Sequence, residues 1–230
     1  MRLPSLLSLF FATTTLAALP YKGVDWSSLL VEEKAGKQYK NSAGQVQPLE
    51  TILKNTGVNT VRQRIWVNPS DGNYNLDYNI KLAKRAKAAG LKIYLDFHYS
   101  DNWADPGKQV VPAAWKSLNR EALIKQVYDY TKSVLNRFQT EGIPLSIVSI
   151  GNEITAGLLW PIGQLSNTDG PKNVAALLKS ASKGVKESSL SSKPKIMIHL
   201  DNGFYWGTQV SLPSLLSCLH EDCNTERTAS

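Results

Sequence analysis

The sequence of 230 residues is poor in the groups that bind metals or cross-link a chain. Its only cysteines, Cys218 and Cys223, lie close together near the C-terminus. Two cysteines cannot complete a zinc site without further ligands, and the sequence does not decide whether they form a local disulfide. An oxygen-rich calcium loop is missing as well. The sequence therefore offers no metal site.

Long apolar runs are also missing, except at the N-terminus. Residues 1–17 contain a basic residue, Arg2, then an apolar stretch through Phe11, and then small residues. The stretch is too short to span a bilayer, so the pattern predicts a signal peptide ending at Ala17 rather than a membrane anchor or a buried first helix. We expect a secreted, extracellular protein with no membrane partner. The sequence has no Asn-x-Ser/Thr acceptor for N-glycosylation.

The formal net charge is +7, but the basic residues are dispersed along the chain. Their densest run, residues 80–92, has Ile80, Leu82, Ala83 and Ala86 at helical spacing. That spacing is typical of a solvated helix face and not of a nucleic-acid patch. We therefore expect a monomer with no nucleic-acid partner.

Short strand-like runs alternate with amphipathic helices along the chain. Helical patterns cover residues 48–57, 75–90, 119–142 and 172–189, with Asn75 as the expected N-cap of the second. Glycine ends each of the first three. The strand-like runs are YKGVDW (21–26), NTVRQRIWV (59–67), LKIYLDFHY (91–99), LSIVSIGNE (145–153) and PKIMIHLDN (194–202).

This alternation predicts a parallel sheet with right-handed crossovers, either an open Rossmann-type sheet or a (β/α)8 barrel. No glycine-rich phosphate loop follows any strand, which counts against a nucleotide-binding sheet. Instead, each strand ends in polar or aromatic groups, and a barrel places its functional groups at these carboxyl ends. The fold class is therefore α/β, of the (β/α)8 TIM barrel type. The groups at the strand ends are Asp25, Trp26, Arg64, Trp66, Asp96, His98, Asn152, Glu153, Asp201 and Asn202.

None of the six tryptophans lies inside a predicted crossover helix. Aromatic rings at one end of a barrel, beside carboxylates and amides, suit stacking against the C–H faces of sugars. The alternative is that these rings only close the top of the core. We favour the sugar platform, because large apolar rings in loops more often bind than pack. Two of the rings close strands and four lie in the loops that follow: Trp26, Trp66, Trp103, Trp115, Trp160 and Trp206.

Strand alternation gives the polar side chains a direction. Arg62, Arg64 and Trp66 share one face of the second run, and Asp96 and His98 share one face of the third. The opposite faces are apolar and should meet the helices, so the charged set should point into the barrel. We expect Arg64 to orient a carboxylate by bidentate hydrogen bonds. His98 is explained equally well as a group that orients a carboxylate or sugar hydroxyl and as a structural histidine.

The run LSIVSIGNE is almost wholly apolar and ends in Asn152 and Glu153. Burying a carboxylate costs on the order of several kcal/mol unless it is paired or neutralised, so a glutamate at this place indicates function. We interpret Glu153 as a general acid. Asn152 can donate a hydrogen bond to a substrate hydroxyl.

The segments DFHYSDNWADPGKQ, VSIGNEITAGLLWP and KPKIMIHLDNG resemble the fungal members of glycoside hydrolase family 53, the arabinogalactan endo-β-1,4-galactanases. The similarity covers about residues 18–209. It implies a (β/α)8 barrel that cleaves β-1,4-galactan, a side chain of pectin, by a retaining mechanism and without a metal or cofactor. One glutamate after strand four is then the acid/base, and one after strand seven is the nucleophile.

The resemblance gives the acid/base role to Glu153, which stands in the matching motif. It also implies that seven residues surround the substrate: Arg64, Trp66, Asp96, His98, Trp103, Asn152 and Trp160.

The sequence predicts only about five of the eight βα units of a barrel. Residues 210–230 have little helical periodicity and no run that could form a further strand. Glu221 and Glu226 lie in this polar tail, so we find no nucleophile in the chain. The expected organisation is a signal peptide at 1–17, a partial catalytic domain at 18–209 and an atypical, disordered tail at 210–230.

Three functions remain. The first is a secreted endo-acting galactanase that is incomplete, and hence inactive, as this chain. The second is a truncated, non-catalytic product. The third is another retaining polysaccharide hydrolase, such as a mannanase or xylanase. The long motifs favour galactan.

Overall fold

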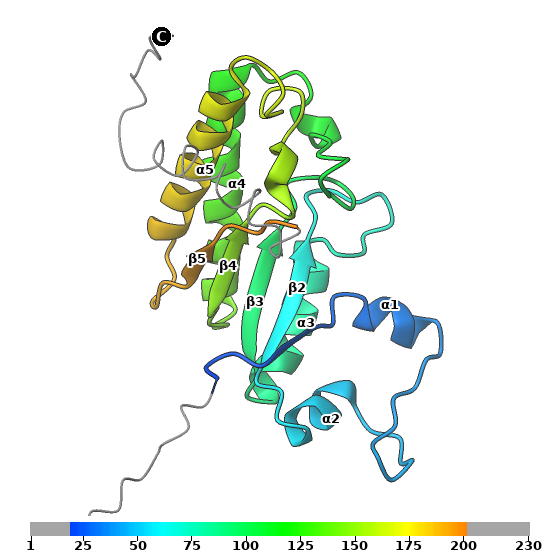
Figure 1. Cartoon of the computed structure of the whole chain (residues 1–230). Coiled ribbons are helices and arrows are strands. Elements are labelled where there is room, and N and C mark those ends of the chain that lie inside the picture. The colour runs from blue at the N-terminus through cyan, green and yellow to red at the C-terminus, as the bar shows by residue number, and fades with distance from the viewer. Residues whose placement is uncertain (1–18, 202–230) are drawn as a thin grey trace, which may run out of the picture.

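A computed structural model of the protein describes residues 19–201. Within this range the five predicted strands form one parallel sheet in the order β1-β2-β3-β4-β5, so the expected alternation is confirmed (Figure 1). The strands are β1 (Gly23–Asp25), β2 (Thr60–Ile65), β3 (Lys92–Phe97), β4 (Ile147–Ile150) and β5 (Lys195–Met197).

The helices lie between the strands, largely where the sequence places them. Asn75 caps α3 and Asn119 caps α4, because each side-chain oxygen accepts a hydrogen bond from the backbone N–H three residues further on. The sequence analysis missed the short helix α1 and the two 3₁₀ turns. The helices are α1 (Leu29–Lys34), α2 (Leu49–Asn55), α3 (Leu76–Ala88), α4 (Arg120–Thr140) and α5 (Gly170–Lys186), with η1 (Ala113–Trp115) and η2 (Ile154–Ala156).

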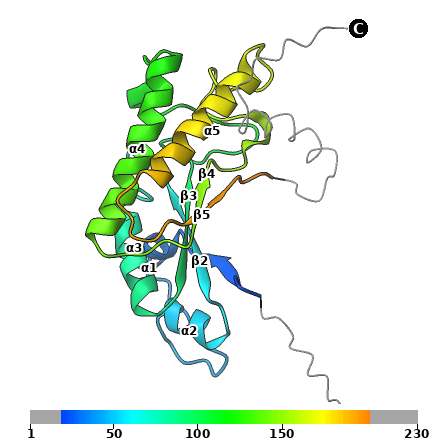
Figure 2. The same cartoon turned by 90° about the vertical axis from the view of Figure 1, so that its left-hand side faces the viewer.

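The helices form a layer on one side of the sheet. Figure 2 shows α3, α4 and α5 on that side, while β1 and β5 curve away from it. A curved parallel sheet with helices on its outer face is the arrangement of consecutive βα units in a (β/α)8 barrel. The predicted fold class is therefore confirmed, and residues 19–201 form five consecutive strands of such a barrel, with helices in the four crossovers between them.

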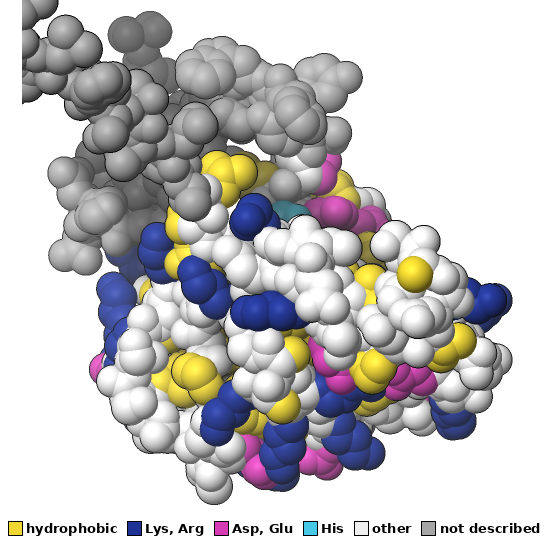
Figure 3. Space-filling view, turned by 90° about the horizontal axis from the view of Figure 1, so that it is seen from below, with side chains coloured by type: hydrophobic (Ala, Val, Ile, Leu, Met, Phe, Trp, Pro, Cys, Tyr) yellow, Lys and Arg dark blue, Asp and Glu magenta, His cyan; other side chains and the backbone are white. Residues whose placement is uncertain are grey.

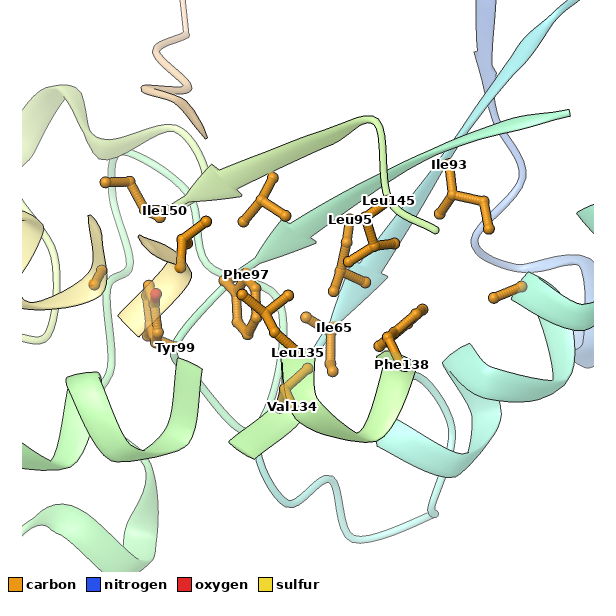
Figure 4. Packing of buried hydrophobic residues seen from close by; sticks show 14 of the residues in the cluster. Ile65, Ile93, Leu95, Phe97, Tyr99, Val134, Leu135, Phe138, Leu145 and Ile150 are labelled. Carbon is orange, nitrogen blue, oxygen red and sulfur yellow. The ribbon is translucent and has the colours of Figure 1, made fainter. Parts of the chain in front are cut away.

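The core lies between the sheet and the helix layer. Outward-facing residues of β2, β3 and β4 meet α4, as the labelled side chains Ile65, Leu95, Phe97, Leu135 and Phe138 illustrate (Figure 4). These five side chains are all fully buried. Burial of this apolar layer is the main force that holds the helices on the sheet.

Several expectations concern residues outside the described range. They are the signal peptide at 1–17, the tail at 210–230, Asn202, Trp206, both cysteines, Glu221 and Glu226. Among residues 19–201, none of the helices is long and apolar enough to cross a membrane. The same residues hold no group of three or more His, Cys, Asp or Glu side chains placed to bind a metal ion.

Candidate active site

The carboxyl ends of the strands bring the predicted polar residues together at one rim. Parallel register places Arg62 of β2 beside Asp25 of β1, and Arg64 beside Asp96 of β3. Val61 and Ile65, on the other face of β2, are fully buried in the core. The predicted division of β2 into a charged inner face and an apolar outer face is therefore confirmed.

Arg62 is the centre of the charged network. Its guanidinium forms ion pairs with Asp25 and with the fully buried Asp96. Its Nη2 also donates to Asn152 Oδ1 at 2.7 Å, which ties β2 to the end of β4. The sequence analysis placed Arg62 on this face but gave the orienting role to Arg64.

Among residues 19–201, Arg64 does not hold a carboxylate by bidentate hydrogen bonds. Its Nε lies 3.7 Å from Asp25 Oδ2, too far for a bidentate hydrogen bond, and its Nη2 donates to Ser28 Oγ at 3.2 Å. The guanidinium instead lies over the ring of Trp103, 4.4 Å from the centroid, and 5.5 Å from that of Tyr74. Arg64 is thus a cation held between aromatic rings.

Asp96 is ionised despite its burial. Burial alone would raise its pKa, but the hydrogen bond with His199 and the positive charge of Arg62 outweigh this and lower the pKa. The His199 Nδ1 lies 3.1 Å from Asp96 Oδ2, while Asp96 Oδ1 has no hydrogen-bond partner within residues 19–201. A buried carboxylate that carries its charge gives Arg62 a fixed anchor.

His98 is buried and neutral at physiological pH. Burial lowers its pKa to about 4, although the negative charge of Asp96 acts in the opposite direction. Its Nδ1 accepts a hydrogen bond from the Ala104 N–H at 3.1 Å, so the ring proton sits on Nε2. That Nε2–H has no hydrogen-bond partner among the described residues. The ring thus holds a loop and still presents a donor, in keeping with both roles that the sequence left open.

Glu153 follows β4 in an unusual backbone conformation. Its φ of 51° and ψ of 49° lie in the left-handed region, which side chains other than glycine and asparagine seldom adopt. Gln109, itself 2% exposed, donates from Nε2 to the backbone carbonyls of Asn152 at 2.8 Å and Glu153 at 3.4 Å. The N–H of Ile154 donates to His199 O at 3.0 Å. Hydrogen bonds on both sides therefore hold this strained turn in place.

Gly151 makes the turn before Glu153 possible. Its φ is 129°, and a Cβ at this position would lie 2.6 Å from the Ile154 side chain. Both the backbone conformation and the space therefore require glycine here.

Asn152 is fixed at both ends of its amide. Oδ1 accepts from Arg62, and Nδ2 donates to Ala104 O at 2.7 Å. The residue is fully buried. One hydrogen of the Nδ2 amide remains for a further acceptor.

The structure divides the tryptophans into two groups. Trp26 and Trp115 are 3% and 5% exposed and belong to the core, so for these two the sugar-platform interpretation is wrong. Trp66 and Trp160 are half-buried, and Trp103 is 39% exposed. Trp66 and Trp103 both make edge contacts with His98, with ring centroids 6.3 and 5.7 Å apart.

Sequence reasoning missed Gln109 and His199 as parts of this site. Gln109 does not lie at the end of a strand. It lies in a loop more than forty positions before Glu153, so no strand pattern pointed to it. His199 lies just past β5 and in phase with Met197, which the register aligns with Ser149 and, through it, with Asp96. The alternation of Ile196, Ile198 and Leu200 with Met197 and His199 could have placed this side chain on the inner face.

Comparison with known proteins gives a consistent result. Residues 21–220 match the family model described as glycosyl hydrolase family 53. The chain is 64% identical over 192 residues to an arabinogalactan endo-β-1,4-galactanase of Thermothelomyces thermophilus, covering 84% of this chain and 57% of the relative. It is 61% identical over 193 residues to a probable galactanase A of Aspergillus fumigatus, covering 84% of this chain and 53% of that protein.

Two solved structures are also similar. One, from a study of two fungal β-1,4-galactanases, shares 60% identity at a TM-score of 0.84 and covers 87% of this chain and 60% of that one. The catalytic domain from Ignisphaera aggregans shares 36% identity at a TM-score of 0.76, covering 86% and 58%. The chain thus spans little more than half the length of the relatives it matches.

Proposed function

The chain belongs to glycosyl hydrolase family 53, and from this premise we propose that it forms the acid/base half of a retaining endo-β-1,4-galactanase. The substrate would be the β-1,4-galactan of pectin side chains, bound as a neutral polysaccharide. The observation that carries the proposal is the position of Glu153 at the carboxyl end of β4, next to an Asn152 amide that two hydrogen bonds hold.

Glu153 would protonate the leaving glycosidic oxygen and then activate the water that releases the sugar. The remaining Asn152 amide hydrogen and the His98 Nε2–H would donate to hydroxyls of the sugar beside the cleaved bond. The partly exposed Trp103, under the Arg64 guanidinium, would provide an aromatic face for sugar stacking, with Trp66 and Trp160 alongside. Asp96 would act through Arg62 by holding its guanidinium on Asn152.

A retaining mechanism needs two carboxyl groups about 5 Å apart, and the family resemblance puts the second after strand seven. Residues 19–201 contain five strands. We therefore propose that a polypeptide of these 230 residues alone has no measurable galactanase activity. We also propose that residues 1–17 direct secretion, which N-terminal sequencing of the exported protein would test.

The experiment uses a completed barrel, in which residues 19–201 are joined to the C-terminal part of the Thermothelomyces relative. This hybrid should cleave galactan internally, and neither mannan nor xylan. Glu153→Gln in the hybrid should lower turnover of galactan about 10²–10⁴-fold, the usual contribution of general acid–base catalysis. An aryl galactoside with a good leaving group should lose much less in the glycosylation step, because that step needs no protonation.

Glu121→Gln is the matched control, since Glu121 is an exposed carboxylate on α4 that pairs with Arg120. It should leave both rates unchanged. Equal losses on galactan and on the activated substrate in the Glu153→Gln hybrid would remove Glu153 from the acid/base role. Preferential cleavage of mannan or xylan would instead overturn the proposed substrate.

A further inference from the structure

The end of the sheet where the strands begin, opposite the rim that carries Glu153, is basic. Figure 3 views the molecule from this end and shows Lys and Arg side chains spread across it. Lys22 precedes β1, Lys92 begins β3 and Lys195 begins β5. Lys54 and Lys87 lie in the last turns of α2 and α3. All five lysines are exposed.

The segments at the strand starts contain no acidic residue, although Asp and Glu side chains from other segments also lie on this end of the molecule (Figure 3). One of them, Glu141, precedes Gly142 of the hollow described below and pairs with Lys84 and Arg137. Residues 19–24, 54–60, 87–95, 143–148 and 188–197 contain no Asp or Glu. The lysines that form salt bridges within residues 19–201 are none of these five, but Lys84, Lys125 and Lys183. We call these five exposed lysines the basic face: Lys22, Lys54, Lys87, Lys92 and Lys195.

Helix dipoles explain only part of the basic face. Lys54 and Lys87 complement the negative ends of their helices, which is a common use of lysine. Lys22, Lys92 and Lys195 stand at strand starts, where no such field attracts them. No Asp or Glu of residues 19–201 forms a salt bridge with these three lysines, whose ammonium groups add positive charge at this end.

The lysines at the strand starts are also held close together. The ammonium groups of Lys92 and Lys195 lie 4.8 and 5.2 Å from the centroid of the Tyr21 ring, next to Lys22 in the chain. Lys92 Nζ donates to Pro20 O at 2.8 Å, and Lys54 Nζ donates to Gly90 O at 3.2 Å. A cluster fixed in this way loses less conformational entropy on binding an anion than freely rotating side chains would.

A hollow lies on the same end of the molecule. Its volume is about 330 Å³, and its lining includes Lys87, Gln139, Ser191 and Ser192. Amide and hydroxyl groups beside a lysine suit the hydroxyls and carboxylate of an acidic sugar.

We propose that the basic face binds a carboxylate-bearing polysaccharide, a polyuronate, at the end of the barrel remote from catalysis. The choice of polyuronate rests on the proposed function, since the galactan is neutral but grows as side chains on the acidic backbone of pectin. A nucleic acid fits less well, because this face offers lysines without arginine forks and its one aromatic ring is covered by two ammonium groups.

The test measures binding of the full chain to polygalacturonate by affinity electrophoresis at about 0.01 M ionic strength, where the Debye length is about 30 Å. The triple variant Lys22→Glu, Lys92→Glu, Lys195→Glu should weaken binding at least tenfold. The matching triple Lys→Gln variant removes the three positive charges without adding negative ones. It should also weaken binding, but by less than the Lys→Glu triple. Raising the salt should abolish binding of the parent chain.

A control triple, Lys37→Glu, Lys81→Glu, Lys172→Glu, changes the net charge equally at exposed lysines away from this face. It should retain binding within about twofold. Equal loss in both triples would show that net charge alone is responsible and would overturn the proposal, as would tighter binding to single-stranded DNA than to polygalacturonate. Because the readout is binding and not hydrolysis, it stands apart from the test of Glu153.

Discussion

The neutral, buried His98 should make the protein less stable in mild acid. Its pKa is lowered from 6.5 to about 4 by burial, so between these values the unfolded chain binds a proton that the folded chain does not. Stability therefore rises with pH across this window and is lost as the pH falls from about 6.5 towards 4.

The size of the effect follows from the shift. Each pKa unit corresponds to about 1.4 kcal/mol, so the full window is worth about 3 kcal/mol, and the step from pH 7 to pH 5 about 2 kcal/mol. For a small domain that is a large part of the total free energy of unfolding.

The assay is urea unfolding followed by tryptophan fluorescence, for the parent chain and for His98→Asn. The Oδ1 of asparagine stands where Nδ1 does and can still accept the hydrogen bond from Ala104 N–H, but asparagine does not titrate. The decrease in unfolding free energy from pH 7 to pH 5 should be about 2 kcal/mol smaller in the variant. Between pH 7 and pH 8 the two proteins should show the same dependence. Identical curves from pH 7 to pH 5 would refute the assignment of a neutral buried imidazole.

Two further predictions concern the network and the aromatic face. Arg62→Met should cost about 3–5 kcal/mol in urea unfolding at pH 7, because it leaves Asp96 buried and charged without its main partner, and adding Asp96→Asn should restore much of the loss. Trp103→Ala should weaken binding of galacto-oligosaccharides by roughly 1–3 kcal/mol in calorimetry with little change in stability. Trp115→Ala, a core ring packed on Tyr130, should instead cost about 3–5 kcal/mol of stability. Lost stability with unchanged affinity in Trp103→Ala would identify that ring as packing.

The secondary structure was readable because local chemistry determines it. Asn75 and Asn119 act as N-caps through hydrogen bonds within one helical turn, and the alternation in β2 follows from strand geometry alone. The short helix α1 escaped because it has six residues and its N-cap, Ser28, makes no capping hydrogen bond. Its place is set by packing of Leu29 into the core, which no local pattern reports.

The partners within the site were not readable, because they depend on how side chains reach across neighbouring strands. Arg62 and Arg64 look equivalent in the sequence, two residues apart on one face. The register pairs Arg62 with Asp25 and Tyr94, and Arg64 with Asp96. The Arg62 side chain nevertheless reaches Asp96 diagonally, while the Arg64 side chain lies among rings. A difference of two positions along β2 therefore decides whether an arginine forms a buried ion pair or lies on an aromatic ring. The sequence pattern alone does not distinguish the two cases.

The loop after β3 connects His98, Asn152 and Glu153 through hydrogen bonds. His98 accepts from the N–H of Ala104, and the carbonyl of Ala104 accepts from Asn152. Further along the same loop, Gln109 donates to the carbonyls of Asn152 and Glu153, and its own carbonyl accepts from the Trp160 N–H at 2.8 Å. This loop therefore holds the turn of Glu153 on one side, and the bond from Ile154 N–H to His199 O holds it on the other, against the cost of a left-handed glutamate.

That arrangement relies on contacts among β2, β3, β4 and the loops that follow them. Glu153 is thus positioned by groups that come before it or shortly after it in the chain, with β5 adding only the His199 contacts. Preorganisation of this kind is what a general acid requires, because its carboxyl must be held within hydrogen-bonding distance of the leaving oxygen. Under the proposed retaining mechanism, the second carboxylate would meet a Glu153 turn that residues 19–201 already hold in place.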